Sequence, residues 1–182
     1  PGKRFVKRLF DIVVSGLFLC TIYPFIYIAV GIAIKFSSPG PIYFKQKRNG
    51  LDGKVFECIK FRSMKVNAQS DTLQATKDDP RKTKVGNFLR KTNLDELPQF
   101  INVFKGDMSI VGPRPHMLKH NEEYSHLIDR YMVRHFVKPG ITGWAQVNGR
   151  DTVDVYDKVY YDREYVQNVS LKFDLKVLWK SV

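Results

Sequence analysis

Two adjacent carboxylates lie in the segment RKTNLDELPQ, which runs from Arg90 to Gln99. Asn93 is predicted to be the N-cap of a helix, with Glu96 closing a capping box three residues later, and this places Asp95 in the first helical turn. The N-terminus of a helix favours both an ionised carboxylate and a bound phosphate. Because Arg90 could neutralise a phosphate brought to Asp95, the segment predicts chemistry on a phosphorylated ligand.

Magnesium is the cation that best suits this carboxylate pair. Mg²⁺ prefers oxygen ligands and usually shares its coordination between one or two carboxylates and substrate phosphates. Bound at Asp95, it would offset the repulsion between a carboxylate and an approaching diphosphate. Acidic residues are also common in a first helical turn for purely structural reasons, because they suit the helix dipole. The pair therefore gains functional meaning only from the residues around it.

Three turn-like motifs each join a cation to a rigid backbone: KFRS at 60–63, GPRP at 112–115 and KPGITG at 138–143. Arginine suits phosphate through its planar fork of donors, and proline and glycine hold a backbone in one shape near a ligand. Each motif could equally be a structural turn. Together with the acidic pair, they predict a cationic site for a phosphorylated substrate.

An apolar run from Ile12 to Ile34 contains no charged residue and has Pro24 near its middle. At about 1.5 Å per residue, a straight helix of this length reaches roughly 34 Å, enough to span a bilayer core of about 30 Å. The run is too long for the apolar region of a signal peptide, and no small-residue cleavage site follows it. A buried core helix remains an alternative, although the run is long for so small a domain.

The charges that flank this run argue against a simple crossing, because positive charge normally concentrates on one side of a spanning helix. Here it lies on both sides, at Lys3, Arg4, Lys7 and Arg8 before the run and at Lys35, Lys45, Lys47 and Arg48 after it. Pro24 removes a helical hydrogen bond to the carbonyl of Cys20 and kinks the helix, and Thr21 and Ser15 could satisfy freed backbone groups. We therefore expect a broken helix at about 10–35 that enters one leaflet and returns, with a straight crossing as the alternative.

The remaining segments predict a mostly helical α+β fold with one small β-hairpin and amphipathic interfacial helices. Residues 42–48 and 54–61 alternate around NGLDG, which is typical of a hairpin, and the polar residues 69–80 predict a surface loop. Helical patterns cover 83–92, 94–106 with Gly106 as its stop, 121–137 and 153–166, and short strands are expected in GDMSIVGPRP and KPGITGWAQVNG. The tail at 171–182 fits a helix at a membrane interface or one packed on the core.

The amino-acid composition limits the kinds of partner that the protein could bind. The 182 residues suffice for one domain with a core, and 30 Lys and Arg against 18 Asp and Glu give a net charge of +12. This charge predicts an anionic partner, which could be a nucleic acid, an acidic membrane surface or a phosphorylated ligand. Cys20 and Cys58 have no paired spacing, so disulfide and zinc sites are disfavoured and a reducing compartment is expected.

Several stretches resemble, in order and spacing, the bacterial sugar transferase domain of monotopic phosphoglycosyl transferases. They are KRLFDIVVS, the proline-broken apolar run, SPGPIYFKQKRNG, KFRSM, RKTNLDELPQFINVFKGDMSIVGPRP, VKPGITGWAQVNG and LKFDLKVLWK. The resemblance covers nearly the whole chain. GPRPH, HNEEY and KPGITGWAQVNGR look most like the undecaprenyl-phosphate glucose phosphotransferase branch.

This resemblance implies transfer of a phosphosugar, glucose 1-phosphate for this branch, from a UDP-sugar to polyprenyl (undecaprenyl) phosphate with release of UMP. Such a step would initiate exopolysaccharide, capsule or other glycan assembly. By similarity Asp95 would be the nucleophile that takes the phosphosugar as an acyl phosphate, with Mg²⁺ bound nearby. Glu96 would orient or deprotonate the incoming lipid phosphate. The family's cationic positions, implied to bind phosphate, fall on Lys60, Arg62, Arg90 and Arg114.

The resemblance also implies a place for the chain. Residues 1–182 would form a single catalytic domain, with a re-entrant membrane helix at about 10–35 and a cytosolic part at about 36–182 on the cytoplasmic face of the bacterial inner membrane. The family often breaks this helix at Ser-Pro, where this chain has Tyr23-Pro24, so the role of the serine must be absent or moved to Thr21. Larger members carry further membrane helices and a nucleotide-fold domain first, so we expect the C-terminal part of a longer protein.

Two other classes of function stay open on the sequence. A non-catalytic protein could use the +12 charge to bind a membrane surface or a nucleic acid, although no nucleic-acid reader motif is present and no nucleic-acid partner is expected. A catalytically inactive scaffold in a glycan assembly complex is the second alternative. The transferred sugar is left open, with His116 and Trp144 as guesses for residues near it, and so is homo-oligomerisation.

Overall fold

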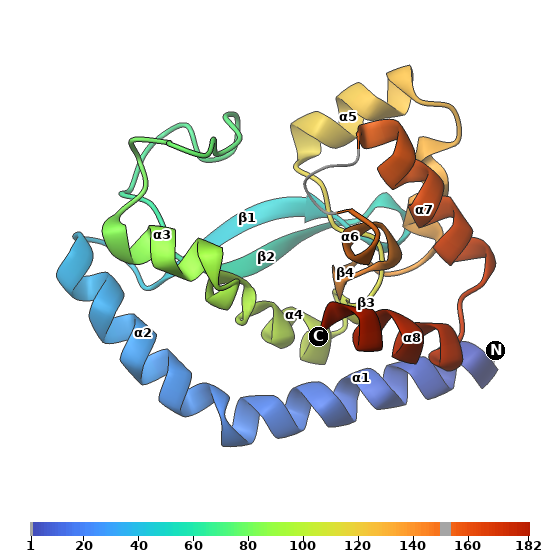
Figure 1. Cartoon of the computed structure of the whole chain (residues 1–182), viewed down its shortest axis with the longest axis horizontal. Helices are drawn as coiled ribbons and strands as arrows, with labels where there is room; N and C mark the ends of the chain where they lie inside the picture. Colours follow the sequence, from blue (N-terminus) through green and yellow to red (C-terminus); the bar gives the residue numbers. More distant parts are fainter. Residues whose placement is uncertain (1, 150–153) are drawn as a thin grey trace.

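The computed structural model describes residues 2–149 and 154–182, and helices dominate it (Figure 1). The α-helices are α1 (Gly2–Thr21), α2 (Tyr23–Ser37), α3 (Lys84–Lys91), α4 (Gln99–Lys105), α5 (Leu118–Leu127), α6 (Trp144–Val147), α7 (Val155–Gln167) and α8 (Leu171–Ser181). Short 3₁₀ helices are η1 (Leu51–Gly53), η2 (Leu94–Glu96) and η3 (Tyr131–Phe136). The strands are β1 (Tyr43–Asn49), β2 (Val55–Phe61), β3 (Ser109–Val111) and β4 (Gly140–Thr142). The predicted α+β class, mostly helical with a small hairpin, is confirmed.

The apolar run forms two helices rather than one. α1 and α2 meet at a bend of 58°, and Pro24 lies in the first turn of α2, where a missing N–H costs least. The hydroxyls of Thr21 and Ser15 donate to the carbonyls of Leu17 and Asp11, not to the Cys20 carbonyl that Pro24 leaves without its helical donor. No individual helix in residues 2–149 and 154–182 has both the length and the apolar character to cross a membrane, and α1 and α2 meet that requirement only together.

The face of α1 that contacts the rest of the protein combines apolar packing by Phe10, Val14 and Phe18 with a row of buried polar residues. Lys7, Asp11 and Ser15 are buried along it, at the spacing of one helical face. Lys7 binds the carboxylate of Asp174 in α8 and the carbonyl of Val111 in β3. Asp11 accepts hydrogen bonds from the hydroxyl of Ser109 at 2.6 Å and from the N–H of Ile110 at 3.2 Å. These contacts fix α1 against β3 and α8.

Large apolar side chains are also exposed on the outer side of the helix pair. The exposed set includes Phe5, Leu9, Val13, Leu17, Phe25, Ile28, Ile32 and Phe36. The protein packs within the bend, where α4 and α8 contact α1 and α3 contacts α2 (Figure 1). The helix pair is therefore covered by protein on one side and leaves an apolar surface on the other.

A two-stranded antiparallel hairpin crosses the middle of the molecule (Figure 1). Its register pairs Tyr43 with Phe61 and Asn49 with Val55, and the hairpin predicted around NGLDG is confirmed. Asn102 of α4 holds β2 from one side, because its Oδ1 accepts from the N–H of Ile59 at 3.0 Å. Thus the hairpin is anchored to the helix that follows the acidic pair.

The GPRP and KPGITG motifs form one structural unit. β3 and β4 pair in parallel. In addition, the N–H of Gly112 donates to the carbonyl of Thr142, and the N–H of Gly140 donates to the carbonyl of Pro113, both at 2.9 Å. A Cβ atom on Gly140 would lie 2.0 Å from the nitrogen of Gly112, so only glycine permits this approach. The two motifs brace each other.

Other predicted elements are confirmed with changed ends. The segment 69–80 is a loop, Gly106 ends α4 with φ 101°, and α7 covers most of the predicted 153–166 helix, of which Val153 lies outside the described residues. The predicted 121–137 helix is wrong as one element, because Arg130 takes a left-handed conformation between α5 and η3. Helix α8 buries Val177 in the core and exposes 84% of Trp179, so the tail has both a packed face and an apolar exposed residue.

Candidate active site

The acidic pair lies on a short 3₁₀ helix, not in an α-helix. Asn93 has φ 59° and makes no side-chain cap, so the predicted capping box with Glu96 is wrong. The cause is Pro98, which has no N–H to donate to the carbonyl of Leu94. The chain instead makes the tighter bonds from Glu96 to Asn93 and from Leu97 to Leu94, and α4 begins only at Gln99.

Asp95 and Glu96 have different partners. Oε1 of Glu96 lies 2.8 Å from Nη2 of Arg114 and 3.5 Å from Nζ of Lys60. Asp95 is only 7% exposed and lines a cleft, yet its carboxylate makes no hydrogen bond or ion pair with any described residue. Glu96 is therefore held in place by cations, and Asp95 is available to a ligand.

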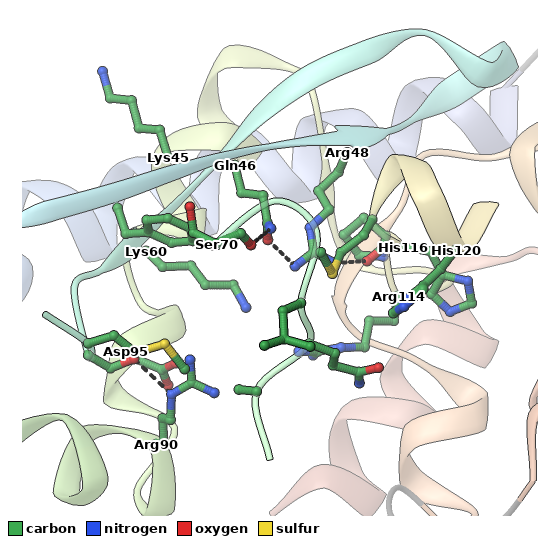
Figure 2. A pocket seen from close by; sticks show the side chains of 18 of the residues that line it. Lys45, Gln46, Arg48, Lys60, Ser70, Arg90, Asp95, Arg114, His116 and His120 are labelled. Carbon is green, nitrogen blue, oxygen red and sulfur yellow. Dashed lines mark hydrogen bonds between the residues drawn. The ribbon is translucent and has the colours of Figure 1, made fainter. Parts of the chain in front are cut away.

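The cleft has a volume of about 620 Å³ and lies between the hairpin and the segments on either side of it. Figure 2 shows Asp95 and Arg90 on one side, Arg114 and His116 on the other, and the side chain of Lys60 directed between them. The loop from 64 to 82 supplies further lining residues. A cleft with this many cations around one unpaired carboxylate suits a ligand that carries several negative charges.

Burial and charge shift the titration of the central groups. Burial raises the pKa of Asp95 above its usual value, while the Lys60 charge opposes this effect. Burial, together with the Arg114 charge, lowers the pKa of Lys60. These opposed shifts are typical of titratable groups held close together in a cleft.

Arg90 reaches the cleft because α3 packs very closely on the end of β2. A Cβ atom on Gly86 would lie 1.8 Å from the carbonyl oxygen of Ser63, so this contact requires glycine. Thr83 caps α3 by accepting from the N–H of Gly86 at 2.8 Å. Nε of Arg90 then donates to the hydroxyl of Ser63 at 2.7 Å, which leaves the rest of its guanidinium beside Asp95.

Arg62 borders the same cleft, but its guanidinium is occupied. It donates to the carbonyls of Ser38, Pro41 and Met64 and to the hydroxyl of Ser38, and the residue is 6% exposed. These contacts tie the end of β2 to the segment that follows α2. Phosphate binding by Arg62 stays a prediction, and its contacts favour a structural role.

The two guesses for residues near the sugar have different outcomes. His116 lines the cleft and its Nδ1 lies 2.5 Å from the hydroxyl of Tyr131. Trp144 packs on Phe173 and donates to Glu164 at 2.9 Å, and it does not line the cleft. The placement of Trp144 near the sugar stays a prediction, and its contacts with Phe173 and Glu164 favour a structural role.

Sequence reasoning missed several polar residues that line the cleft. They are Gln46, Arg48, His120, Arg134, Gln146, Lys158 and Asp162. Gln46, Arg48, His120 and Gln146 lie within stretches that carry the family resemblance, but no role in the site was predicted for them, and the other three lie outside those stretches. Their meeting at one cleft could not be predicted from local patterns, because segments distant in the sequence bring them together.

The described residues contain no cluster of three or more His, Cys, Asp or Glu side chains that could hold a metal by themselves. The adjacent carboxylates of Asp95 and Glu96 nonetheless fit Mg²⁺, which commonly takes one or two protein carboxylates and completes its shell with substrate phosphates and water. Asp95 is the better candidate ligand, because Glu96 already binds Arg114 and Lys60.

Known proteins are similar over almost the whole chain. A profile described as bacterial sugar transferase matches residues 2–182. The chain is 54% identical to the UDP-glucose:undecaprenyl-phosphate glucose-1-phosphate transferase of Escherichia coli, over 99% of this chain and 40% of that protein. It is 43% identical to the undecaprenyl-phosphate galactose phosphotransferase of Salmonella typhimurium, over 99% and 40% of the two chains. It is 41% identical to the UDP-N-acetylgalactosamine-undecaprenyl-phosphate N-acetylgalactosaminephosphotransferase of Aeromonas hydrophila, over 100% of this chain and 44% of that protein. The chain thus spans less than half the length of these relatives.

Proposed function

Because the chain belongs to the bacterial sugar transferase family, we propose that it transfers a phosphosugar from a UDP-sugar to polyprenyl (undecaprenyl) phosphate and releases UMP. Glucose 1-phosphate is the favoured group, because relatives at 54% and 52% identity have UDP-glucose in their names. Relatives named for galactose and N-acetylgalactosamine follow at 43% and 41% identity, so these sugars are the alternatives.

The unpaired state of Asp95 supports this proposal most directly. A carboxylate is a better nucleophile towards phosphorus when no cationic side chain of the protein occupies its oxygens, and among the described residues Asp95 makes no such contact while Glu96 is held by Arg114 and Lys60. Lys60, Arg90 and Arg114 stand around it and would neutralise an approaching diphosphate. The two carboxylates are thereby suited to different tasks.

The proposed reaction has two displacement steps at one phosphorus atom. A carboxylate oxygen of Asp95 forms a bond to the phosphorus that carries the sugar, and the bond from that phosphorus to the bridging oxygen breaks with its electron pair on UMP. An oxygen of the lipid phosphate then bonds to the same phosphorus, and the acyl phosphate bond breaks to restore the carboxylate. Glu96 would accept a proton from the lipid phosphate.

Mg²⁺ is part of this proposal. Asp95 and the substrate phosphates would hold it, and it would supply positive charge against the diphosphate. The roles of the chain's own cations follow from their positions. Lys60 and Arg114 hold Glu96, and Arg90 stands beside Asp95 with Ser63 fixing one edge of its guanidinium.

A lipid substrate requires access to a membrane, and the helix pair α1–α2 could provide it by inserting into the bilayer. Both arms pack on the same body of protein, and large apolar side chains are exposed along both of them. A pair that crossed the bilayer would place these packed elements in lipid, where their polar groups could not be satisfied. We therefore place α1 and α2 in one leaflet as a re-entrant element, with the catalytic part on the cytoplasmic face of the bacterial inner membrane.

The exposed residues beyond the helix pair agree with this placement. Helix α3 contacts α2, and α4 and α8 contact α1. These three helices carry the exposed apolar residues Phe88, Phe104, Leu175 and Trp179. Exposed apolar groups of this kind, together with a charge of +12, suit contact with an anionic bilayer surface. The product would enter exopolysaccharide, capsule or another glycan.

Turnover tests the proposal. The protein in detergent is supplied with Mg²⁺, undecaprenyl phosphate and one UDP-sugar at a time from glucose, galactose, N-acetylglucosamine and N-acetylgalactosamine. We expect UMP release and a lipid-linked sugar, fastest with UDP-glucose, and neither in D95N or after chelation of the metal. Absence of turnover with every donor, together with salt-sensitive binding to DNA, would favour a non-catalytic binder instead.

A further inference from the structure

Arg134 lies behind Arg114 and takes no part in the reaction described above. It borders the cleft, but its side chain is only 2% exposed. Its Nε and Nη2 both lie 3.2 Å from Oδ2 of Asp162, and its Nη1 donates to the hydroxyl of Tyr131 at 3.1 Å. Nη2 also donates to the backbone carbonyl of Arg114. The guanidinium is thus engaged on every side and offers little to a ligand.

The carbonyl that Arg134 holds belongs to the residue whose side chain binds Glu96. Arg114 Nη2 lies 2.8 Å from Glu96 Oε1, so the position of this peptide sets the geometry of the ion pair. The next carbonyl, of Pro115, accepts from Nη1 of Arg48 in β1 at 3.1 Å. Two arginines from different elements therefore hold two consecutive peptides at the edge of the cleft.

Burial of the Arg134–Asp162 ion pair costs free energy of desolvation, which is reasonable if the pair orients a neighbouring group. Both side chains are almost fully buried, at 2% and 5% exposure. A buried ion pair usually adds little stability compared with apolar packing, because both charges lose their water. The hydrogen bond from Arg134 to the carbonyl of Arg114 is the contact that apolar residues could not replace.

We propose that Arg134, oriented by Asp162, is a positioning residue that fixes Arg114 on Glu96 through the backbone carbonyl of Arg114. It acts through Arg114 and does not touch the substrate. The inference rests on the proposed function for its kinetic test, because the effect is measured as turnover of the UDP-sugar.

A double-mutant cycle separates this role from a general structural one. The kcat and KM for UMP release from UDP-glucose are measured for wild type, R114A, R134K and R114A/R134K. Lysine keeps the charge but lacks the planar fork, so we expect R134K alone to lower kcat by about tenfold or more. Because R114A removes the side chain that Arg134 positions, adding R134K to it should cost less than about a further twofold. Losses that simply multiply would overturn the proposal.

Matched variants of two buried ion pairs provide the control. D162N weakens the pair with Arg134, and D174N weakens the pair that Lys7 makes on α1. We expect D162N to reproduce the kcat loss of R134K, and D174N to lower the unfolding temperature while leaving kcat within about twofold. Equal kcat losses in folded D162N and D174N would contradict a positioning role.

A chemical readout works without turnover. The rate at which phenylglyoxal modifies Arg114 is followed by peptide mass spectrometry, and it should rise in D162N and in Y131F but not in D174N. Unchanged rates in D162N and Y131F would overturn the proposal even if R134K does not fold. If wild type turns over and the cycle is multiplicative, only the positioning role fails. If wild type does not turn over, the proposed function fails and the modification rates still decide the positioning role.

Discussion

Asp95 and Glu96 are chemically similar neighbours, and only their partners distinguish them. Arg114 and Lys60 hold Glu96, whereas Asp95 faces the cleft unpaired among the described residues. This difference gives each carboxylate a separate task in the proposed reaction. It also means that changing either residue removes a different function.

Glu96→Gln keeps the shape of the side chain and removes its charge. We expect the kcat for phosphosugar transfer to fall by about 100-fold or more, because the neutral amide cannot accept a proton and binds Lys60 and Arg114 less well. Steady-state UMP release with undecaprenyl phosphate measures this effect. A variant with near wild-type kcat would remove Glu96 from the mechanism.

His135 should make the fold sensitive to acid. Burial, reinforced by the Arg134 charge, lowers its pKa from 6.5 to about 4, and its Nδ1 is buried with no hydrogen-bond partner among the described residues. Between pH 4 and 6.5 the unfolded chain therefore binds more protons at this position, so stability falls as the pH falls through this range. At pH 5 the expected loss is about 2 kcal/mol relative to neutral pH.

Unfolding midpoints at pH 5, 6 and 7 test this dependence. His135→Gln should flatten the pH dependence, and His126→Gln, which changes an exposed residue, serves as the control and should leave it unchanged. An identical pH dependence in the wild type and the H135Q variant would rule out the contribution of His135.

At the scale of elements, the turn before the acidic pair decides where the carboxylates point. The sequence pattern correctly placed a helix stop at Gly106 but predicted an unbroken helix from 94, because a capping box and a 3₁₀ start share the same residue types. Pro98 is the residue that distinguishes the two cases. Its lack of an N–H makes the 3₁₀ turn necessary, and Asn93 enters it with φ 59°.

Substitutions at Asn93 test this turn. Glycine adopts a positive φ freely, so N93G should retain most of the activity, whereas valine at φ 59° should cost about 1–2 kcal/mol and displace the carboxylates. Turnover and the unfolding midpoint are measured for both variants. A fully active N93V would show that the left-handed turn is not required.

The elements that face the cleft from a distance could not be predicted from local patterns. Arg48, Arg134 and Asp162 come from β1, η3 and α7, and nothing in the local pattern of these segments shows that the three residues meet. The resemblance to a family pointed to Lys60, Arg90 and Arg114, because these lie within recognisable motifs. It also pointed to Arg62, which the fold occupies with backbone carbonyls.

At the scale of the whole molecule, the apolar run and its flanking charges predicted a broken helix, and the break at Pro24 is present as a 58° bend. The buried polar row on α1 was not predicted, because the partners of Lys7 and Asp11 lie in β3 and α8, which are distant in the sequence. The sequence therefore indicated where the helices break but not which face they present to the protein.

The proposed re-entrant placement predicts that both ends of the helix pair lie on one side of the membrane. Single cysteines at the exposed positions Lys3 and Lys47, in a chain with Cys20 and Cys58 replaced by serine, should react with a membrane-impermeant maleimide only in inverted vesicles. Labelling of one position in inverted vesicles and of the other in intact cells would mean that the chain crosses the bilayer.

The proposed role of Asp95 is tested most directly by a covalent adduct. The protein is incubated with UDP-glucose and Mg²⁺ without any lipid phosphate, and its peptides are analysed by mass spectrometry. We predict one UMP released per protein molecule and a phosphohexose on the peptide that contains Asp95, with neither in D95N. UMP release that requires the lipid and leaves no adduct, or an adduct that persists in D95N, would contradict the account.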